Sequence, residues 1–136
     1  MKSLKRQIPS PDERQRVLVI DDDRDMLEVL FQTLKLEGFE AVIVADSAAA
    51  LTLLDKIKPD VVILDTDRPA NDGIEVIDSM RERSDVPIIV LTQDNEVESL
   101  RQAISHGADD YVRKPFGAKS FAARIRAKIR RAQLSC

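Results

Sequence analysis

The stretch from Asp60 to Gly73, DVVILDTDRPANDG, decides how this chain folds. Its apolar run, residues 61–64, contains only valine, isoleucine and leucine and leads directly into Asp65. Such a run is typical of a strand that is buried on both faces of a parallel sheet. Because ligands of open α/β sheets bind outside the carboxyl ends of the strands, Asp65 lies where a reacting group is expected. A plain turn residue would look the same in this stretch alone.

Similar apolar runs lie on both sides of the central one, and segments with helical spacing of apolar residues separate them. The expected strands cover residues 17–20, 41–44, 61–64, 87–91 and 110–112. The helical segments follow them, with Asp23 and Ser47 as expected N-caps and Gly38 and Gly107 as expected stops. Strands and helices that alternate with short connections form right-handed crossovers. The sequence therefore predicts a single doubly wound α/β domain, with a five-stranded parallel sheet and helices on both faces.

Length, charge and cysteine content narrow the class of protein. The 136 residues suit one domain with its own core. A net charge of -3 argues against a nucleic-acid-binding surface as the main function. The one cysteine, Cys136, allows no disulfide framework within a chain, which fits a reducing cytoplasm. No apolar signal region and no stretch of membrane-spanning length is found.

The domain boundaries follow from composition. Residues 1–15 contain two prolines, several basic residues and little apolar content, so we expect a disordered leader or linker there. The domain is expected to cover residues 16–132, and residues 133–136 form a C-terminal tail.

Polar residues with related chemistry stand at the ends of several strands. Asp21 and Asp22 follow the first strand, and Asp65 follows the third; Thr92 and Lys114 follow the fourth and fifth. Carboxylates that converge raise one another's pKa unless a cation lies between them, and hard oxygen ligands suit Mg²⁺. A divalent ion, an ammonium and a hydroxyl beside a carboxylate are suited to handling a phosphoryl group, with Asp65 as the nucleophile. Each residue alone is commonplace, whereas the combination is specific.

Four segments in order, VLVIDDD, VVILDTDRPANDG, IIVLT and GADDYVRKPF, resemble the receiver domain of two-component response regulators. The resemblance covers about residues 16–132 and implies a flavodoxin-like (βα)5 fold. It implies that Asp65 accepts phosphate from a sensor histidine kinase or a phosphotransfer protein. The domain would catalyse this transfer itself and hydrolyse the acyl phosphate slowly, acting as a switch rather than an enzyme.

The resemblance also implies a role for each polar residue. Asp22 and Asp65 would bind Mg²⁺ directly, together with the backbone carbonyl of Asp67, and Asp21 would act through water. Thr92 and Lys114 would contact the phosphoryl oxygens in that arrangement.

Tyr111 matches the family's switch aromatic, which turns inward when Thr92 moves toward the phosphate. The peptide bond between Lys114 and Pro115 is expected to be cis.

Some positions depart from the family pattern. Arg68 stands where Met usually precedes the proline, and Gln93 follows Thr92 where a small residue is usual. Asp67 and Asp94 flank the same pocket. We hypothesise that these positions change the lifetime of phosphorylated Asp65.

The C-terminal part, residues 114–131, carries seven basic residues and no acidic one. It is equally a solvated helix face or a surface for a partner. ADDY and RIRAKIRR resemble the winged-helix transcription-factor branch, in which acids and arginines pair across a homodimer, here through about residues 97–131. The residues that keep part of this set are Asp109, Asp110, Arg124 and Arg131. Leu100 and Ser120 replace a charged pair, and Leu100 is either helix core or an interface contact.

Two other functions compete with this prediction. LDTD resembles the nucleophile motif of haloacid-dehalogenase-type phosphatases, although that motif normally follows the first strand. A degenerate receiver that only binds partners is the second alternative. We expect no membrane association and no direct nucleic-acid binding by this domain.

Overall fold

The computed structural model describes residues 14–67, 73–93 and 96–134. Five parallel strands form one sheet in the order β2-β1-β3-β4-β5. The strands are β1 (Arg16–Ile20), β2 (Glu40–Val44), β3 (Val61–Asp65), β4 (Ile88–Thr92) and β5 (Asp110–Arg113). The helices are α1 (Arg24–Leu36), α2 (Ser47–Ile57), α3 (Gly73–Arg81), α4 (Val97–His106) and α5 (Ala118–Leu134). None of these described helices has the length and apolar character needed to cross a membrane.

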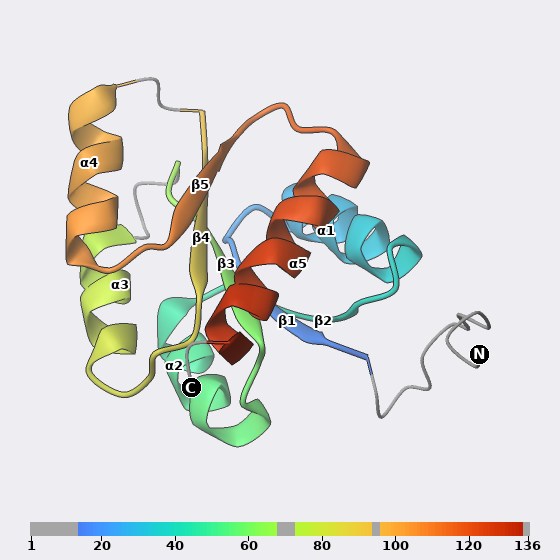
Figure 1. Cartoon of the computed structure of the whole chain (residues 1–136), viewed down its shortest axis with the longest axis horizontal. Helices are drawn as coiled ribbons and strands as arrows, with labels where there is room; N and C mark the ends of the chain where they lie inside the picture. Colours follow the sequence, from blue (N-terminus) through green and yellow to red (C-terminus); the bar gives the residue numbers. More distant parts are fainter. Residues whose placement is uncertain (1–13, 68–72, 94–95, 135–136) are drawn as a thin grey trace.

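Helices cover both faces of the sheet, as the sequence predicts. Alternate strand residues point to opposite faces, so each strand contributes to two apolar clusters. Val19 and Ile63 pack in the cluster that α1 and α5 cover, and Leu18 and Leu64 pack in the cluster that α2, α3 and α4 cover. Figure 1 shows α1 and α5 on one side of the sheet and α3 and α4 on the other. The doubly wound α/β prediction is confirmed.

The ends of the first two helices test the cap predictions. Asp23 caps α1, since its Oδ1 accepts hydrogen bonds from the amides of Asp25 and Met26. The expected cap Ser47 is wrong: Asp46 caps α2, and its Oδ1 accepts a hydrogen bond of 2.9 Å from the Ala49 amide. Both residue types are good N-caps, and the aspartate comes one position earlier in an extended backbone conformation, which leaves Ser47 in the first turn.

The strand register assembles the carboxyl edge of the sheet. Ile20 pairs with Leu64, so Asp21 and Asp65 follow neighbouring strands at the same level. Thr92 pairs with Arg113 at the end of β4 and β5. Because β1 lies between β2 and β3, the connections leave β1 and β3 in opposite directions, which makes their ends the switch point where such sheets bind ligands.

Arg81, at the end of α3, ties the opposite edge of the sheet together. Its guanidinium donates hydrogen bonds to the carbonyls of Ser84, Val86 and Gly107 and to the Asp109 carboxylate. Gly107 has a φ of +126°, and a Cβ there would lie 2.8 Å from the Arg81 Cγ. Glycine is therefore needed at position 107 for backbone conformation and for close approach.

We expect Gly107→Ala to lower the free energy of unfolding by about 2–4 kcal/mol, because it adds backbone strain and displaces a hydrogen-bonded arginine. Gly38→Ala is the matched control, because Gly38 also has a positive φ, +93°, but open space around it. This control should cost only about 1 kcal/mol. Urea unfolding measures both, and equal losses would contradict the role given to Arg81.

Candidate phosphoryl site

Lys114 lies between two carboxylates at the carboxyl edge of the sheet. Its Nζ contacts the Asp65 carboxylate directly and lies 3.0 Å from Oδ2 of Asp67. Burial opposes the charge on Lys114, but these contacts outweigh burial and raise its pKa. The bond that joins Lys114 to Pro115 is cis, as expected. The strand end thus holds a partly buried cation that faces two acids.

Asp21 is the second fully buried acid of the site. Its Oδ1 accepts a hydrogen bond of 3.0 Å from the Asp23 amide. Its Oδ2 has no hydrogen-bond donor among the residues that the structure describes. Burial, and then the nearby Asp65 carboxylate, raises the pKa of Asp21 to about 7, although the Asp23 amide and Lys114 act in the opposite direction. This oxygen is a buried acceptor suited to a proton or a cation.

The side chain of Asp67 reaches across to the end of β4. Its Oδ1 accepts a 3.0 Å hydrogen bond from the Thr92 hydroxyl, and the Gln93 amide lies 3.0 Å from both carboxylate oxygens. Burial raises the pKa of Asp67, but the hydrogen bonds from Gln93, Lys114 and Thr92 outweigh it, and the pKa lies below the ordinary value. Asp67 is therefore an ionised acceptor with three donors around it.

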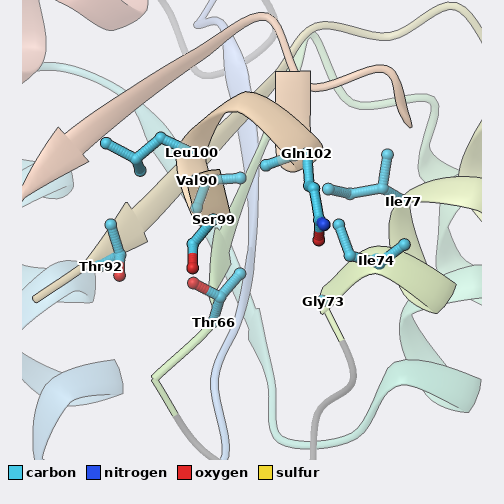
Figure 2. Close-up of a pocket in the computed structure, with 10 residues that line it drawn as sticks. Thr66, Gly73, Ile74, Ile77, Val90, Thr92, Ser99, Leu100 and Gln102 are labelled. Atoms are coloured by element: carbon cyan, nitrogen blue, oxygen red, sulfur yellow. The ribbon is translucent and has the colours of Figure 1, made fainter. Parts of the chain in front are cut away.

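Thr92 also faces a cavity of about 210 Å³ between α3 and α4. The wall of this cavity is mixed: Ile74, Ile77 and Leu100 line it together with the polar residues Thr66, Ser99 and Gln102. Figure 2 shows Thr92 and Ile77 on opposite sides of it. Leu100 is buried, so the alternative that places it in the helix core holds. A shift of Thr92 would change the space between these two helices.

Tyr111, the expected switch aromatic, lies on the same face of the sheet as Thr92. It pairs with Val90 in the strand register, and its side chain packs on the cluster beneath α2, α3 and α4. It is partly buried, and Arg124 donates a hydrogen bond of 3.0 Å to its carbonyl. Its role as a switch remains a prediction.

A second hollow opens on the other side of Lys114. This groove of about 670 Å³ lies between α1 and the connection from β5 to α5. Met26, Val29 and Thr33 line it from α1, and Pro115 and Phe116 line it from the connection. Val29 is 52% exposed there. The groove offers an apolar surface directly beside the partly buried Lys114 ammonium.

The structure brings Asp21, Asp65, Thr92 and Lys114 to one edge, and Asp22 follows the same strand as Asp21. The sequence analysis gave Asp67 a backbone ligand role and a place beside the pocket, but it missed the hydrogen bonds of the Asp67 side chain with Thr92 and Gln93. The register carried the missing signal, since Asp65 pairs with Leu91 and position 67 thus falls beside position 93. Arg68 and Asp94 lie outside the described residues.

Comparison with known proteins places this chain in a family. The family model described as "Response regulator receiver domain" matches residues 17–126. The DNA-binding response regulator MtrA of Mycolicibacterium smegmatis is 42% identical over 118 residues, which cover 87% of this chain and 52% of that protein. The sensory transduction protein RegX3 of Mycobacterium bovis is 41% identical over 116 residues, covering 85% of this chain and 51% of that protein. The chain spans about half the length of these curated relatives.

Solved structures agree with the sequence comparisons. A two-component response regulator from Clostridium difficile superposes with a TM-score of 0.81 at 27% identity, covering 88% of this chain and 98% of that one. The receiver domain of the Francisella response regulator 1452 gives 0.80 at 27% identity, covering 88% and 99%. These similarities favour the receiver prediction over the phosphatase alternative. The matched model, the relatives and the strand-end residues together show that this chain belongs to the response regulator receiver domain family.

Proposed function

We propose that Asp65 is the phosphoacceptor of this receiver domain. The observation that carries the proposal is the contact between the buried Asp65 carboxylate and the Lys114 ammonium at the switch point of the sheet. A carboxylate oxygen of Asp65 attacks the phosphorus atom of a phosphohistidine. The new O–P bond forms as the N–P bond breaks, and the electron pair and a proton remain with the histidine.

The remaining side chains handle charge in this transfer. Lys114 offsets the negative charge that accumulates on the phosphoryl oxygens, and the Thr92 hydroxyl donates a hydrogen bond to one of them. Both groups already lie beside Asp65 or Asp67. Tyr111 shares the sheet face with Thr92, so we infer that a shift of Thr92 reaches α4 through that face.

A magnesium ion fits the acidic end of the site. Asp21 is buried with an oxygen that has no described hydrogen-bond donor, and it lies beside Asp65. No three acidic, histidine or cysteine side chains converge as a ready metal site within the described ranges. Mg²⁺ needs only one or two carboxylates, since it retains waters. We propose that Asp22, Asp65 and the Asp67 carbonyl hold the ion, with Asp21 acting through water; when bound, it would neutralise phosphoryl charge.

We infer that the kinase or phosphotransfer protein docks on the groove between α1 and the β5–α5 connection. The groove places an apolar surface next to Lys114, and Val29 stands exposed on it. A partner helix with a phosphohistidine could cover this surface and reach Asp65 from the same side.

The homodimer through about residues 97–131 remains a prediction, and the contacts within the chain bear on it. Asp109 pairs with Arg81 at 2.8 Å, and Asp110 pairs with Arg124 at 3.1 Å in the same protomer. The acids expected to pair across a dimer thus have partners already, and the exposed Val97 and Ile104 of α4 offer apolar contacts instead.

The names of the relatives support the transcription-factor branch, because MtrA is described as DNA-binding. That this domain itself binds no nucleic acid stays a prediction, which its net charge of -3 favours. The cytoplasm is the proposed location.

We expect Asp65→Asn to abolish phosphorylation by acetyl phosphate and Mg²⁺, because an amide is no nucleophile for phosphorus. Mass spectrometry should show the mass of one phosphoryl group on the wild type and none on the variant. Asp55→Asn, an exposed acid of α2, is the control and should be phosphorylated normally. A phosphorylated Asp65→Asn chain, or rapid turnover of many phosphomonoesters, would contradict the proposal.

Asp21→Asn should raise the free energy of unfolding at pH 8 without Mg²⁺ by about 1–3 kcal/mol. The folded-state pKa of Asp21 is raised from 3.8 to about 7, so wild-type stability falls as the pH rises through that window, whereas the amide does not titrate. The gain in stability should be smaller at pH 5 than at pH 8. At pH 8 it should also be smaller with Mg²⁺ than without it, because Mg²⁺ stabilises the wild type. Urea unfolding with EDTA or Mg²⁺ measures it.

The matched control is Asp46→Asn, which removes a charge at the same edge of the sheet and keeps an N-cap. It should leave the stability nearly unchanged at both pH values. A gain for Asp21→Asn that is equal at pH 5 and pH 8 would show that burial of charge is not its cause.

Val29→Lys should slow phosphotransfer from a sensor kinase that phosphorylates the wild type by about tenfold or more, because it places a charge in an apolar contact. Phosphorylation by acetyl phosphate should be unchanged, since that reagent needs no docking surface. Ile104→Lys, on the exposed side of α4, is the control and should keep both reactions. An equal decrease in the rate of phosphorylation by the kinase and by acetyl phosphate would show that the substitution disturbs the phosphorylation site and not docking.

A further inference from the structure

The side-chain carboxylate of Asp67 suggests a role separate from the Mg²⁺ binding proposed for its backbone carbonyl. Thr92, Gln93 and Lys114 approach its carboxylate from two different segments, the end of β4 and the end of β5. All three distances are 3.0 Å, which is normal for hydrogen bonds to an ionised acceptor. The arrangement surrounds one anion with a hydroxyl, a backbone amide and an ammonium.

The same groups are the ones that a phosphoryl group on Asp65 would need. Lys114 contacts Asp65 and Asp67 together, so the two carboxylates share one cation. The Thr92 hydroxyl has a single proton to donate, and so has the Gln93 amide. Each can serve the Asp67 carboxylate or a phosphoryl oxygen in full strength, but not both.

The fold explains why position 67 reaches this place. Thr66 donates its amide to the carbonyl of Leu91, which keeps the chain beside β4 beyond the end of β3. The Asp67 amide then donates to Oδ1 of Asp65 at 2.9 Å, so the backbone folds back over the strand end. This turn leaves the Asp67 side chain level with Thr92 and Gln93.

We propose that the Asp67 carboxylate occupies the phosphoryl subsite of the unphosphorylated chain, where it holds Thr92 and Lys114 until a phosphoryl group on Asp65 displaces it. Asp67 is a positioning residue in this scheme. Phosphorylation then exchanges one anion for another at Thr92 instead of filling an empty place. The Thr92 hydroxyl is therefore already hydrogen-bonded to an anion before phosphorylation. An incoming phosphoryl group must compete with the Asp67 carboxylate for Thr92 and Lys114. The inference rests on the proposed function of Asp65.

The amide proton of Gln93 reports on the acceptor directly. In ¹⁵N spectra of the Mg²⁺-free chain, we expect this resonance to lie downfield in the wild type and to move upfield in Asp67→Ala, because the anionic acceptor is lost. Asp67→Asn keeps the size and one acceptor oxygen without the charge, and should give an intermediate shift. Beryllofluoride with Mg²⁺, a stable phosphoryl mimic, should return the Asp67→Ala resonance downfield and change the wild type little.

Affinity for beryllofluoride gives the second readout. Asp67→Ala should bind it about tenfold more tightly than the wild type, because no carboxylate competes for the charge-assisted donors. Asp46→Asn removes one negative charge at the same sheet edge without touching these donors, and should change the affinity far less. The overall dispersion of each spectrum confirms that a variant is folded.

Two results would overturn the inference. The first is a Gln93 amide that resonates at the same position in the wild type and Asp67→Ala; the second is an affinity gain in Asp46→Asn equal to that in Asp67→Ala, which would reduce the effect to net charge. Failure of the proposed function looks different. In that case no variant binds beryllofluoride, while the Mg²⁺-free amide shifts still show whether Asp67 holds its donors.

Discussion

The contact of the Lys114 ammonium with two carboxylates is the interaction on which this site depends. Asp21, Asp65 and Asp67 gather negative charge at a place that is shielded from water, where like charges repel more strongly than at the surface. The partly buried Lys114 ammonium touches Asp65 and lies near Asp67, and it offsets part of this repulsion. Asp21 is left with a raised pKa, chiefly because it is buried and then because the Asp65 carboxylate lies nearby. The site is thus ready for a further positive charge at one end and for a competing anion at the other.

The sheet supplies the rigidity that holds these groups together against their repulsion. Residues 17–20 of β1 and all those of β3 are buried, so neither strand can move away without disturbing both apolar clusters. Parallel pairing then fixes the two strand ends at the same level. Burial of the aliphatic residues before the carboxylates supplies most of the free energy that keeps the strand ends close, and the contacts of Lys114 add to it.

The sequence was sufficient for the parts of the molecule that burial determines. Strands covered on both faces appear as unbroken aliphatic runs, and their polar ends share an edge, so Asp65 and Lys114 were expected to meet. The side-chain role of Asp67 depends on a turn after β3 and on the register with β4, and neither is encoded in local composition. The pairing of Asp109 with Arg81 was not predicted either, because the two residues are 28 positions apart and meet only where helix α3 ends beside the start of β5.

Strand geometry also places the acidic residues Asp21 and Asp65 on one face of the sheet and Thr92 on the other. Asp21 and Asp65 lie two residues after Val19 and Ile63 and so on the same face of the sheet, which α1 and α5 cover. The groove beside Lys114 lies on this side of the sheet as well. Thr92 falls in the alternation of Val90 and faces the cavity between α3 and α4. Its hydroxyl nevertheless bonds Asp67 across the strand end. Thr92 therefore contacts both layers, and under the proposed function a change of anion beside its hydroxyl would reach the packing between α3 and α4.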